Sequence, residues 1–198
     1  MSPSRVCTQC RQPLSPWARA DSLYCSTRCR VAAHRGRHAS DDPVPAALRN
    51  RDRWLRHRAK RPITVDGRSA SSTDARTWTT HEQALASRVG DGIGFVLHGD
   101  GIICVDIDNC VSGTHVASWA ASMLAALPPT YIERSPSGRG LHVWGTGHLS
   151  AGRVVKVDGG KVEVYGSGRY MTVTGQRFAG APSLLADLSA TIAQITNH

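Results

Sequence analysis

One segment constrains the fold of this chain most strongly, namely the alternation of side chains along residues 102–108. The odd-numbered positions from Ile103 to Ile107 are apolar, whereas Asp106 and Asp108 occupy even-numbered positions. A period of two is typical of a β-strand with one buried face, so both carboxylates should point to the same, opposite face. Two like charges this close repel each other, and a divalent cation held by both would offset the repulsion. The alternative is an ordinary solvent-exposed strand end.

A second alternating segment, residues 161–165, supplies a third carboxylate. Its two valines alternate with Lys161, Glu163 and Tyr165, which therefore share the polar face of a strand. We expect Glu163 to join the two aspartates as a ligand of Mg²⁺ or Mn²⁺. The alternative for Glu163 is a surface ion pair with Lys161 or Arg169.

Candidate phosphate ligands lie in the loop 135–140 and in the strand that follows it. The two glycines of this loop let backbone amides approach an anion without a Cβ in the way. Arg139 and His142 add side-chain donors, and His142 falls on the polar side of the strand if its two apolar neighbours face the core. The segment predicts a triphosphate cradle, and an ordinary turn is the alternative.

Four cysteines near the start of the chain, Cys7, Cys10, Cys25 and Cys29, form two close pairs separated by a short loop. This spacing matches a tetrahedral structural zinc site, and four thiolates leave no open position for water. A segment this short cannot build its own core, so bound Zn²⁺ would supply its folding energy. Disulfides are the alternative, but no signal peptide or membrane-spanning run is present, and we expect a cytoplasmic protein.

The net charge of +9 is concentrated at one end of the chain. Residues 1–62 hold 14 Lys and Arg against 4 Asp and Glu, whereas residues 63–198 hold 10 against 11. A basic block on a near-neutral domain favours a polyanion partner, most simply nucleic acid, and a solubility tail is the alternative. The predicted DNA-binding residues are the arginines that flank the second cysteine pair: Arg28, Arg30, Arg35 and Arg37.

The domain organisation follows from these patterns. We predict a basic zinc module over residues 1–39, a proline-broken linker over 40–45 and one larger domain over 46–198. Periodicity and turn signals predict an α+β domain with a mainly antiparallel sheet and segregated helices. Helices are expected over 46–60, 79–88, 114–127 and 182–195. Strands are expected over 63–65, 93–97, 102–108, 131–134, 141–144, 154–157, 161–165 and 170–174.

Two features of connectivity are also expected. The glycine-rich turn at 98–101 should lead the strand 93–97 directly into the strand 102–108, and residues 158–160 give a hairpin signal between their flanking strands. The last strand should pair after the glycines at 166 and 168.

The order of these motifs resembles the archaeo-eukaryotic primase superfamily. More narrowly, the chain resembles the bifunctional primase–polymerase domains of phages and plasmids. The resemblance rests on residues 103–108, 137–142, 162–165 and 166–175 in this order, and it extends from about Trp54 to Gly180. It implies a compact fold related to RNA-recognition-type sheets.

The resemblance also implies roles for the candidate residues. Asp106, Asp108 and Glu163 would hold Mg²⁺ or Mn²⁺, and His142 would hold the triphosphate and complete the catalytic set. The nucleotide-binding set would be Ser137, Gly138, Arg139, Gly140, His142, Lys161 and Arg169. The implied partners are a single-stranded DNA template or a primer–template, together with NTP or dNTP.

The function expected from these implications is template-directed nucleotidyl transfer by a DNA primase/polymerase of a phage, prophage or plasmid. Because the chain ends at His198, we expect extension rather than de novo initiation, and a helicase would be a separate chain. Three alternatives stay open: a non-catalytic, zinc-containing nucleic-acid-binding protein, a metal-dependent nuclease, and a zinc-finger regulator that binds a small nucleotide.

Overall fold

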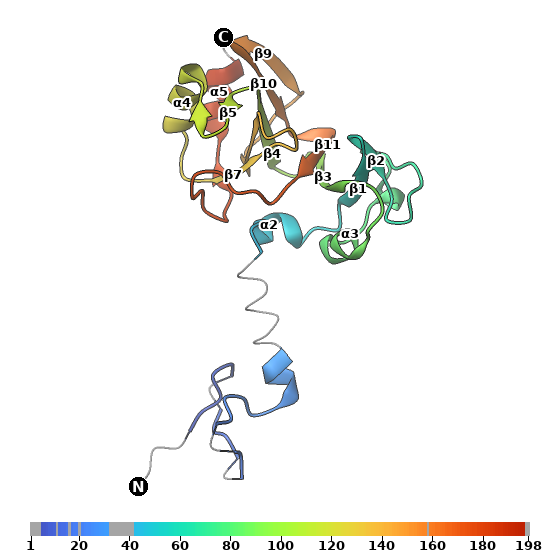
Figure 1. Cartoon of the computed structure of the whole chain (residues 1–198), viewed down its shortest axis with the longest axis vertical. Helices are drawn as coiled ribbons and strands as arrows, with labels where there is room; N and C mark the ends of the chain where they lie inside the picture. Colours follow the sequence, from blue (N-terminus) through green and yellow to red (C-terminus); the bar gives the residue numbers. More distant parts are fainter. Residues whose placement is uncertain are drawn as a thin grey trace. The chain divides into compact units, whose positions relative to one another are not determined.

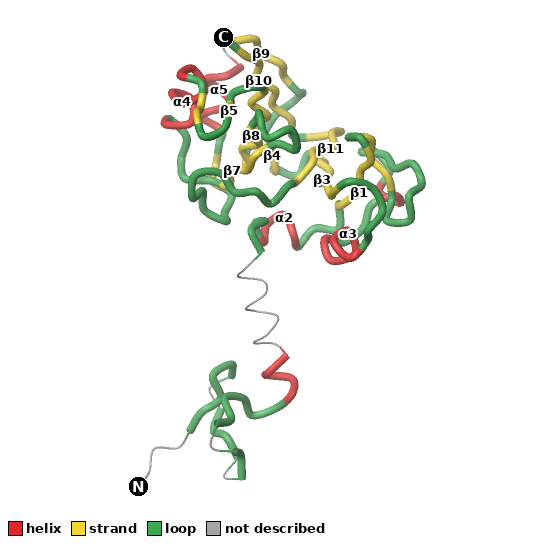
Figure 2. Tube along the Cα trace, in the orientation of Figure 1, coloured by secondary structure: helices red, strands yellow, loops and turns green. Residues whose placement is uncertain are grey.

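The computed structural model describes residues 5–10, 12–15, 17–19, 21–31, 42–157 and 159–196. It divides into two compact units, Met1–Asp42 and Pro43–His198, which we call the N-terminal and the C-terminal unit. Figures 1 and 2 show their elements, which we describe separately for each unit. Within the described residues, no helix has both the length and the apolar character needed to cross a lipid bilayer.

The C-terminal unit is built around a six-stranded sheet, which we call the large sheet. Its pairings are antiparallel except for the short parallel pair β12–β8. The strand order is β12 (Ala186–Asp187), β8 (Leu141–Thr146), β4 (Ile102–Asp108), β10 (Gly160–Tyr165) and β9 (Arg153–Val157), with β7 (Tyr131–Arg134) also on β8.

A four-stranded antiparallel sheet, the small sheet, comes from more distant parts of the chain. Its order is β11 (Ser167–Val173), β3 (Gly92–His98), β1 (Trp54–Arg58) and β2 (Arg61–Ile63). The β1–β2 turn contains Ala59 and Lys60, both with positive φ (48° and 63°). Such a turn normally favours glycine, and here Asp91 Oδ2 stabilises it by accepting the Ala59 amide at 2.6 Å.

The helices are short, and a further hairpin joins β5 (Val111–Ser112) to β6 (His115–Val116). The helical segments described in the C-terminal unit are α2 (Ala46–Arg49), the 3₁₀ turn η1 (Ala75–Thr77), α3 (His81–Ala86), α4 (Ser118–Ala125) and α5 (Ser189–Thr196). In the N-terminal unit, residues 27–31 are helical. This architecture confirms the predicted α+β class with a mainly antiparallel sheet.

The two faces of β4 explain where the site lies. Ile103, Val105 and Ile107 pack in one core with α4 and α5. On the other face, Ile102 and Cys104 belong to a second core that includes residues of the small sheet. The even-numbered positions then continue as Asp106 and Asp108, beyond the edge of that second core. The predicted alternation is therefore confirmed, and its polar part begins where apolar packing between the sheets ends.

The helix predicted over 46–60 is wrong after its first turn, because α2 ends at Arg49 and β1 begins at Trp54. Local propensity favoured a helix, but β1 pairs on both edges, with β2 and with β3. Its side chains are also buried on both faces, and Arg56 Nε donates to the Val89 carbonyl at 2.6 Å.

Other boundaries shift by smaller amounts. The predicted helix over 79–88 is shorter, since α3 spans His81–Ala86, and Thr80 and Gln83 form a capping box at its start. The predicted helix over 114–127 begins only at Ser118, because the preceding residues form β6. The last helix begins at Ser189 rather than at 182.

The predicted connections are confirmed in part. The turn at 98–101 leads β3 directly into β4, as predicted, although the two strands do not pair, because β3 lies in the small sheet and β4 in the large sheet. The last strand, β11, pairs with β3 rather than with the preceding β10. The predicted β9–β10 hairpin is confirmed, with Gly160 opposite Val157.

Candidate functional site

The candidate active site is built by strand register in the large sheet. Asp106 on the central strand β4 lies directly opposite Glu163 on β10 and His142 on β8. Directly opposed residues in antiparallel strands point to the same face, so the three predicted side chains are brought together. Asp108 is opposite Lys161 in the same way.

These side chains open into a pocket of about 390 Å³. Asp106, Asp108, His142 and Glu163 line its large-sheet wall, and Ser137 belongs to the adjoining loop. The opposite wall comes from the small sheet and its loops, with Lys60, Ser72, Arg169 and Tyr170 among its residues. The pocket therefore has an acidic wall facing a wall that carries two cations.

Lys161 lies within the acidic cluster. Its Nζ is 2.8 Å from Asp108 Oδ2 and 2.7 Å from Glu163 Oε1. Hydrogen bonds with these two carboxylates raise the pKa of Lys161, so the ammonium stays charged. The ion pair that the sequence left open for Glu163 is thus present, alongside the predicted carboxylate cluster.

Asp106 and Glu163 experience different electrostatic surroundings. Burial raises the pKa of Asp106, and the charges of Asp108 and Glu163 act in the same direction against His142 and Lys161. Burial also raises the pKa of Glu163, but hydrogen bonds from Lys161 and Tyr165 outweigh it and lower the pKa overall. Of these two carboxylates, Asp106 would therefore gain more electrostatic stabilisation from an added cation.

A buried carboxylate supports the site from behind His142, namely Glu133 on β7, which is 0% exposed. It accepts hydrogen bonds from the Tyr131 hydroxyl (2.9 Å) and the Trp144 indole (3.2 Å). It also accepts the backbone amides of Thr174 (3.0 Å) and Gly175 (2.9 Å). These donors fix Glu133 in place and compensate its burial.

Glu133 in turn orients His142. The ring Nδ1 of His142 lies 3.4 Å from Glu133 Oε1, and its Nε2 lies 3.8 Å from Asp106 Oδ1. Burial lowers the pKa of His142, but the hydrogen bond to Glu133 and the charges of Asp106 and Glu133 outweigh it and raise the pKa. These two carboxylates therefore favour the protonated form of the imidazole at the wall of the pocket.

A chain of contacts extends from the acidic wall to Arg169. The Tyr165 hydroxyl donates to Glu163 Oε2 at 2.7 Å and accepts from Arg169 Nη2 at 2.8 Å. The Arg169 guanidinium also stacks over the Tyr165 ring, 4.4 Å from its centroid. Arg169 is thus held at the pocket with donors left over for an anion.

The loop 135–140 departs in one respect from the predicted cradle. The amides of Gly138 and Gly140 donate to the Ser135 carbonyl (2.8 Å) and hydroxyl (3.1 Å), so they are engaged within the loop. Gly140 is needed for packing, since a Cβ there would lie 2.9 Å from the Ile107 carbonyl. Arg139 is exposed and lines a neighbouring hollow of about 520 Å³, together with Ser137 and Gly138.

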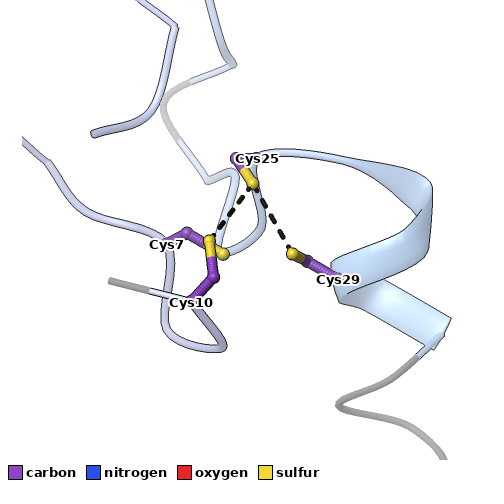
Figure 3. Close-up of side chains that lie close together, drawn as sticks. All are labelled: Cys7, Cys10, Cys25 and Cys29. Atoms are coloured by element: carbon purple, nitrogen blue, oxygen red, sulfur yellow. Dashed lines mark hydrogen bonds between the residues drawn. The ribbon is translucent and has the colours of Figure 1, made fainter. Parts of the chain in front are cut away.

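The four cysteines of the N-terminal unit converge (Figure 3). Their sulfur atoms lie within 4.8 Å of one another, and Cys25 is 3.5 Å from Cys10 and 3.6 Å from Cys29. Hydrogen bonds with Cys10 and Cys29 raise the pKa of Cys25 to about 12. A bound cation would favour the thiolate form of the four side chains, since like charges this close repel one another. Of the predicted DNA-binding arginines, Arg28 and Arg30 are exposed, whereas Arg35 and Arg37 fall outside the described residues.

Comparison with known proteins gives two findings. Residues 30–193 match the Prim-Pol family, described as the N-terminal domain of bifunctional DNA primase/polymerase. The chain belongs to this family. A DNA primase-polymerase of Nitratiruptor phage NrS-1 is 36% identical over 152 residues, which cover 70% of this chain and 21% of that protein. The chain thus spans about a fifth of the length of the curated relative that it matches.

The carboxylate wall fits the divalent metal that Prim-Pol domains use. Asp106 Oδ1 is buried and has no hydrogen-bond partner, so its lone pairs are available to coordinate a cation. In the described part of the chain, however, the four cysteines are the only group of three or more such side chains whose ligand atoms all lie within 4.8 Å of one another. The three carboxylates do not form such a group, and Lys161 lies between Asp108 and Glu163.

The sequence did not reveal several residues of this Prim-Pol site. Glu133 shares a strand face with Tyr131, a period-two signal, but only its pairing opposite His142 shows what it contacts. Lys60 and Tyr170 reach the pocket from the small sheet, whose pairings are non-local. Cys104 and Cys110 are free and buried.

Proposed function

We propose that this chain is a template-directed nucleotidyltransferase, a DNA primase/polymerase unit that acts in the replication of a phage, prophage or plasmid. The observation that carries the proposal is the register of Asp106 with Glu163 and His142 on the wall of a cation-lined pocket, within a Prim-Pol domain. Phosphoryl transfer depends on positioning and charge neutralisation, which is what such a wall provides.

The residues of the pocket divide this work. Asp106, Asp108 and Glu163 would hold Mg²⁺ or Mn²⁺, which in such sites activates an attacking hydroxyl and neutralises the leaving phosphates. His142, held by Glu133, donates to the triphosphate. Arg169, held by Tyr165, binds the triphosphate from the opposite wall.

The other residues predicted to bind the nucleotide have different proposed roles. Ser137 contributes its hydroxyl, whereas Gly138 and Gly140 shape the loop rather than donate amides. Arg139 faces the neighbouring hollow, where it would contact a phosphate of the growing strand. Lys161 reaches the nucleotide only after it leaves the carboxylates.

The N-terminal unit would bind DNA. Its four thiols would bind one structural Zn²⁺, and Arg28 and Arg30 would supply salt-sensitive phosphate contacts. Trp17 is 92% exposed, and an exposed indole in a basic unit is suited to stacking on the bases of a single strand.

One gel assay tests the proposal. The purified chain is incubated with unprimed or primed template, with NTPs or dNTPs, and with Mg²⁺ or Mn²⁺. We expect the primer to be extended, and Asp106→Ala to lower incorporation by about 1,000-fold or more while DNA binding survives. Near wild-type extension by this variant would disprove the site.

The same assay addresses the alternatives. Shortening of the labelled strand without added nucleotide would identify a nuclease. DNA binding with no change in strand length under any condition would identify a non-catalytic binding protein, and binding restricted to one operator-like sequence would identify a regulator.

A further inference from the structure

We propose that Lys161 is a built-in counter-cation that occupies the metal position in the ion-free site and must be displaced when a divalent ion binds. The inference rests on the proposed function, since it concerns the same carboxylates. It adds a role that the nucleotide-binding assignment of Lys161 does not contain.

The geometry of Lys161 carries the first step. Its ammonium contacts Asp108 at 2.8 Å and Glu163 at 2.7 Å, so one positive charge bridges two of the three acidic side chains. Register imposes this arrangement, because Lys161 is directly opposite Asp108 and two residues before Glu163 on the same strand face. The position of Lys161 is therefore fixed by strand pairing and not by the conformation of a loop.

Exclusion is the second step. A divalent ion binds carboxylate oxygens at about 2.1 Å, so an ion shared by Asp106, Asp108 and Glu163 would lie among the carboxylates that now pair with the ammonium. Two cations cannot occupy this space, since an ammonium and a divalent ion repel each other strongly at such separations. Binding of the ion and the present position of Lys161 are thus mutually exclusive.

The third step is that Lys161 is able to leave. Its side chain is 42% exposed and has a flexible four-carbon stem. Among the described residues, its ammonium pairs only with the carboxylates of Asp108 and Glu163. Arg169 differs, because it is stacked on Tyr165 and hydrogen-bonded to it. Lys161 is consequently the cation that exchanges, and Arg169 the one that stays.

Two consequences follow for the protein. The ion-free site is stabilised because its carboxylates already have a counter-cation. Metal affinity is lowered by the cost of displacing the ammonium, and the released lysine becomes free to meet a nucleotide triphosphate. Metal binding and triphosphate binding are thereby coupled through one side chain.

The test measures Mn²⁺ binding to the full chain by electron paramagnetic resonance, without nucleotide or DNA. We expect Lys161→Met to bind Mn²⁺ about tenfold more tightly than the wild type. Lys161→Arg should bind more weakly than the wild type, because a guanidinium pairs with two carboxylates in a more persistent geometry. The matched control is Lys156→Met, since Lys156 lies opposite Lys161 on β9, is exposed and makes no ion pair with any described residue.

Thermal unfolding supplies a second readout. Without metal, Lys161→Met should melt below the wild type, and saturating Mn²⁺ should close the gap. Equal Mn²⁺ affinity in the wild type and Lys161→Met, or an equal gain in Lys156→Met, overturns the inference but leaves the proposed function intact. Failure of the wild type to bind Mn²⁺ more tightly than Asp106→Ala overturns both.

Discussion

The two ligand clusters of this chain solve the problem of like charges in opposite ways. In the N-terminal unit, four thiols converge within 4.8 Å, and Cys7 is the only buried residue among those the structure describes there. In the C-terminal unit, two apolar cores hold the strands, and the carboxylates stand apart with an ammonium between two of them. The comparison suggests that a fold which depends on its ion closes around it, whereas a fold that exists without its ion keeps the site open.

The sharpest way to break this comparison is to remove one thiol. Cys25→Ser should lower zinc from one ion per chain to near zero and unfold the N-terminal unit, because zinc supplies its folding energy. DNA affinity should fall at least tenfold, while the melting temperature of the C-terminal unit stays unchanged. Metal analysis and DNA titration measure this. Cys110→Ser, the same change at a buried free thiol, should keep the zinc.

The next largest effect concerns the rigidity of the acidic site. Glu133→Gln should destabilise the C-terminal unit by about 3 kcal/mol, since the amide group would face donors that now point at a carboxylate. Urea unfolding measures the loss, and Glu82→Gln on the exposed face of α3 is the matched control. If both variants unfold alike, Glu133 does not have the structural role described here.

A smaller effect is expected from Tyr165→Phe, which removes one hydroxyl between Glu163 and Arg169. Because Arg169 keeps its stacking but loses an anchor, the KM for the nucleotide should rise about tenfold with a smaller change in kcat. Steady-state primer extension gives both constants. A drop in kcat alone would place the hydroxyl's role elsewhere.

The smallest effect tests an ion pair outside the site. Burial raises the pKa of Asp100, but hydrogen bonds and charges of Arg51 and Arg53 outweigh it and lower the pKa. A lowered folded-state pKa means that the stabilisation is complete above the unfolded-state pKa and disappears as pH falls through the folded-state pKa. Asp100→Asn should therefore cost about 1 kcal/mol at pH 7, given that Asp100 is more than a third exposed, and nothing once both states are protonated.

Denaturation at a series of pH values measures this cost. Asp52→Asn is the control, because Asp52 is exposed and makes no ion pair with any described residue. A gap between wild type and Asp100→Asn that stayed constant down to pH 3 would contradict the assignment.

How much of the structure the sequence could predict depended on whether a signal was local. The period-two pattern located Asp106, Asp108 and Glu163 correctly on strands, and the strand over Tyr131–Arg134 has the predicted bounds. Whether these carboxylates hold metal stays a prediction. The helix expected over 46–60 failed because β1 is stabilised by pairing with β3, almost 40 residues away, which no local window contains.

Strand pairing was less predictable for the same physical reason. The turn at 98–101 leads from one strand into the next, as predicted, but a glycine-rich turn alone does not show whether the two strands pair or lie in different sheets. Phe95 of β3 packs against Trp144 of β8 across the two sheets, a contact between residues far apart in the sequence. Glu133 was missed because its period-two pattern with Tyr131 does not show which residues it contacts in space.

The odd–even division of β4 has an evolutionary consequence. A one-residue shift of this strand's register would turn Asp106 and Asp108 toward the helices and Ile103 and Ile107 toward the pocket side, and so disrupt packing and chemistry together. Related sequences should therefore tolerate insertions and deletions in the connecting loops but not within β4.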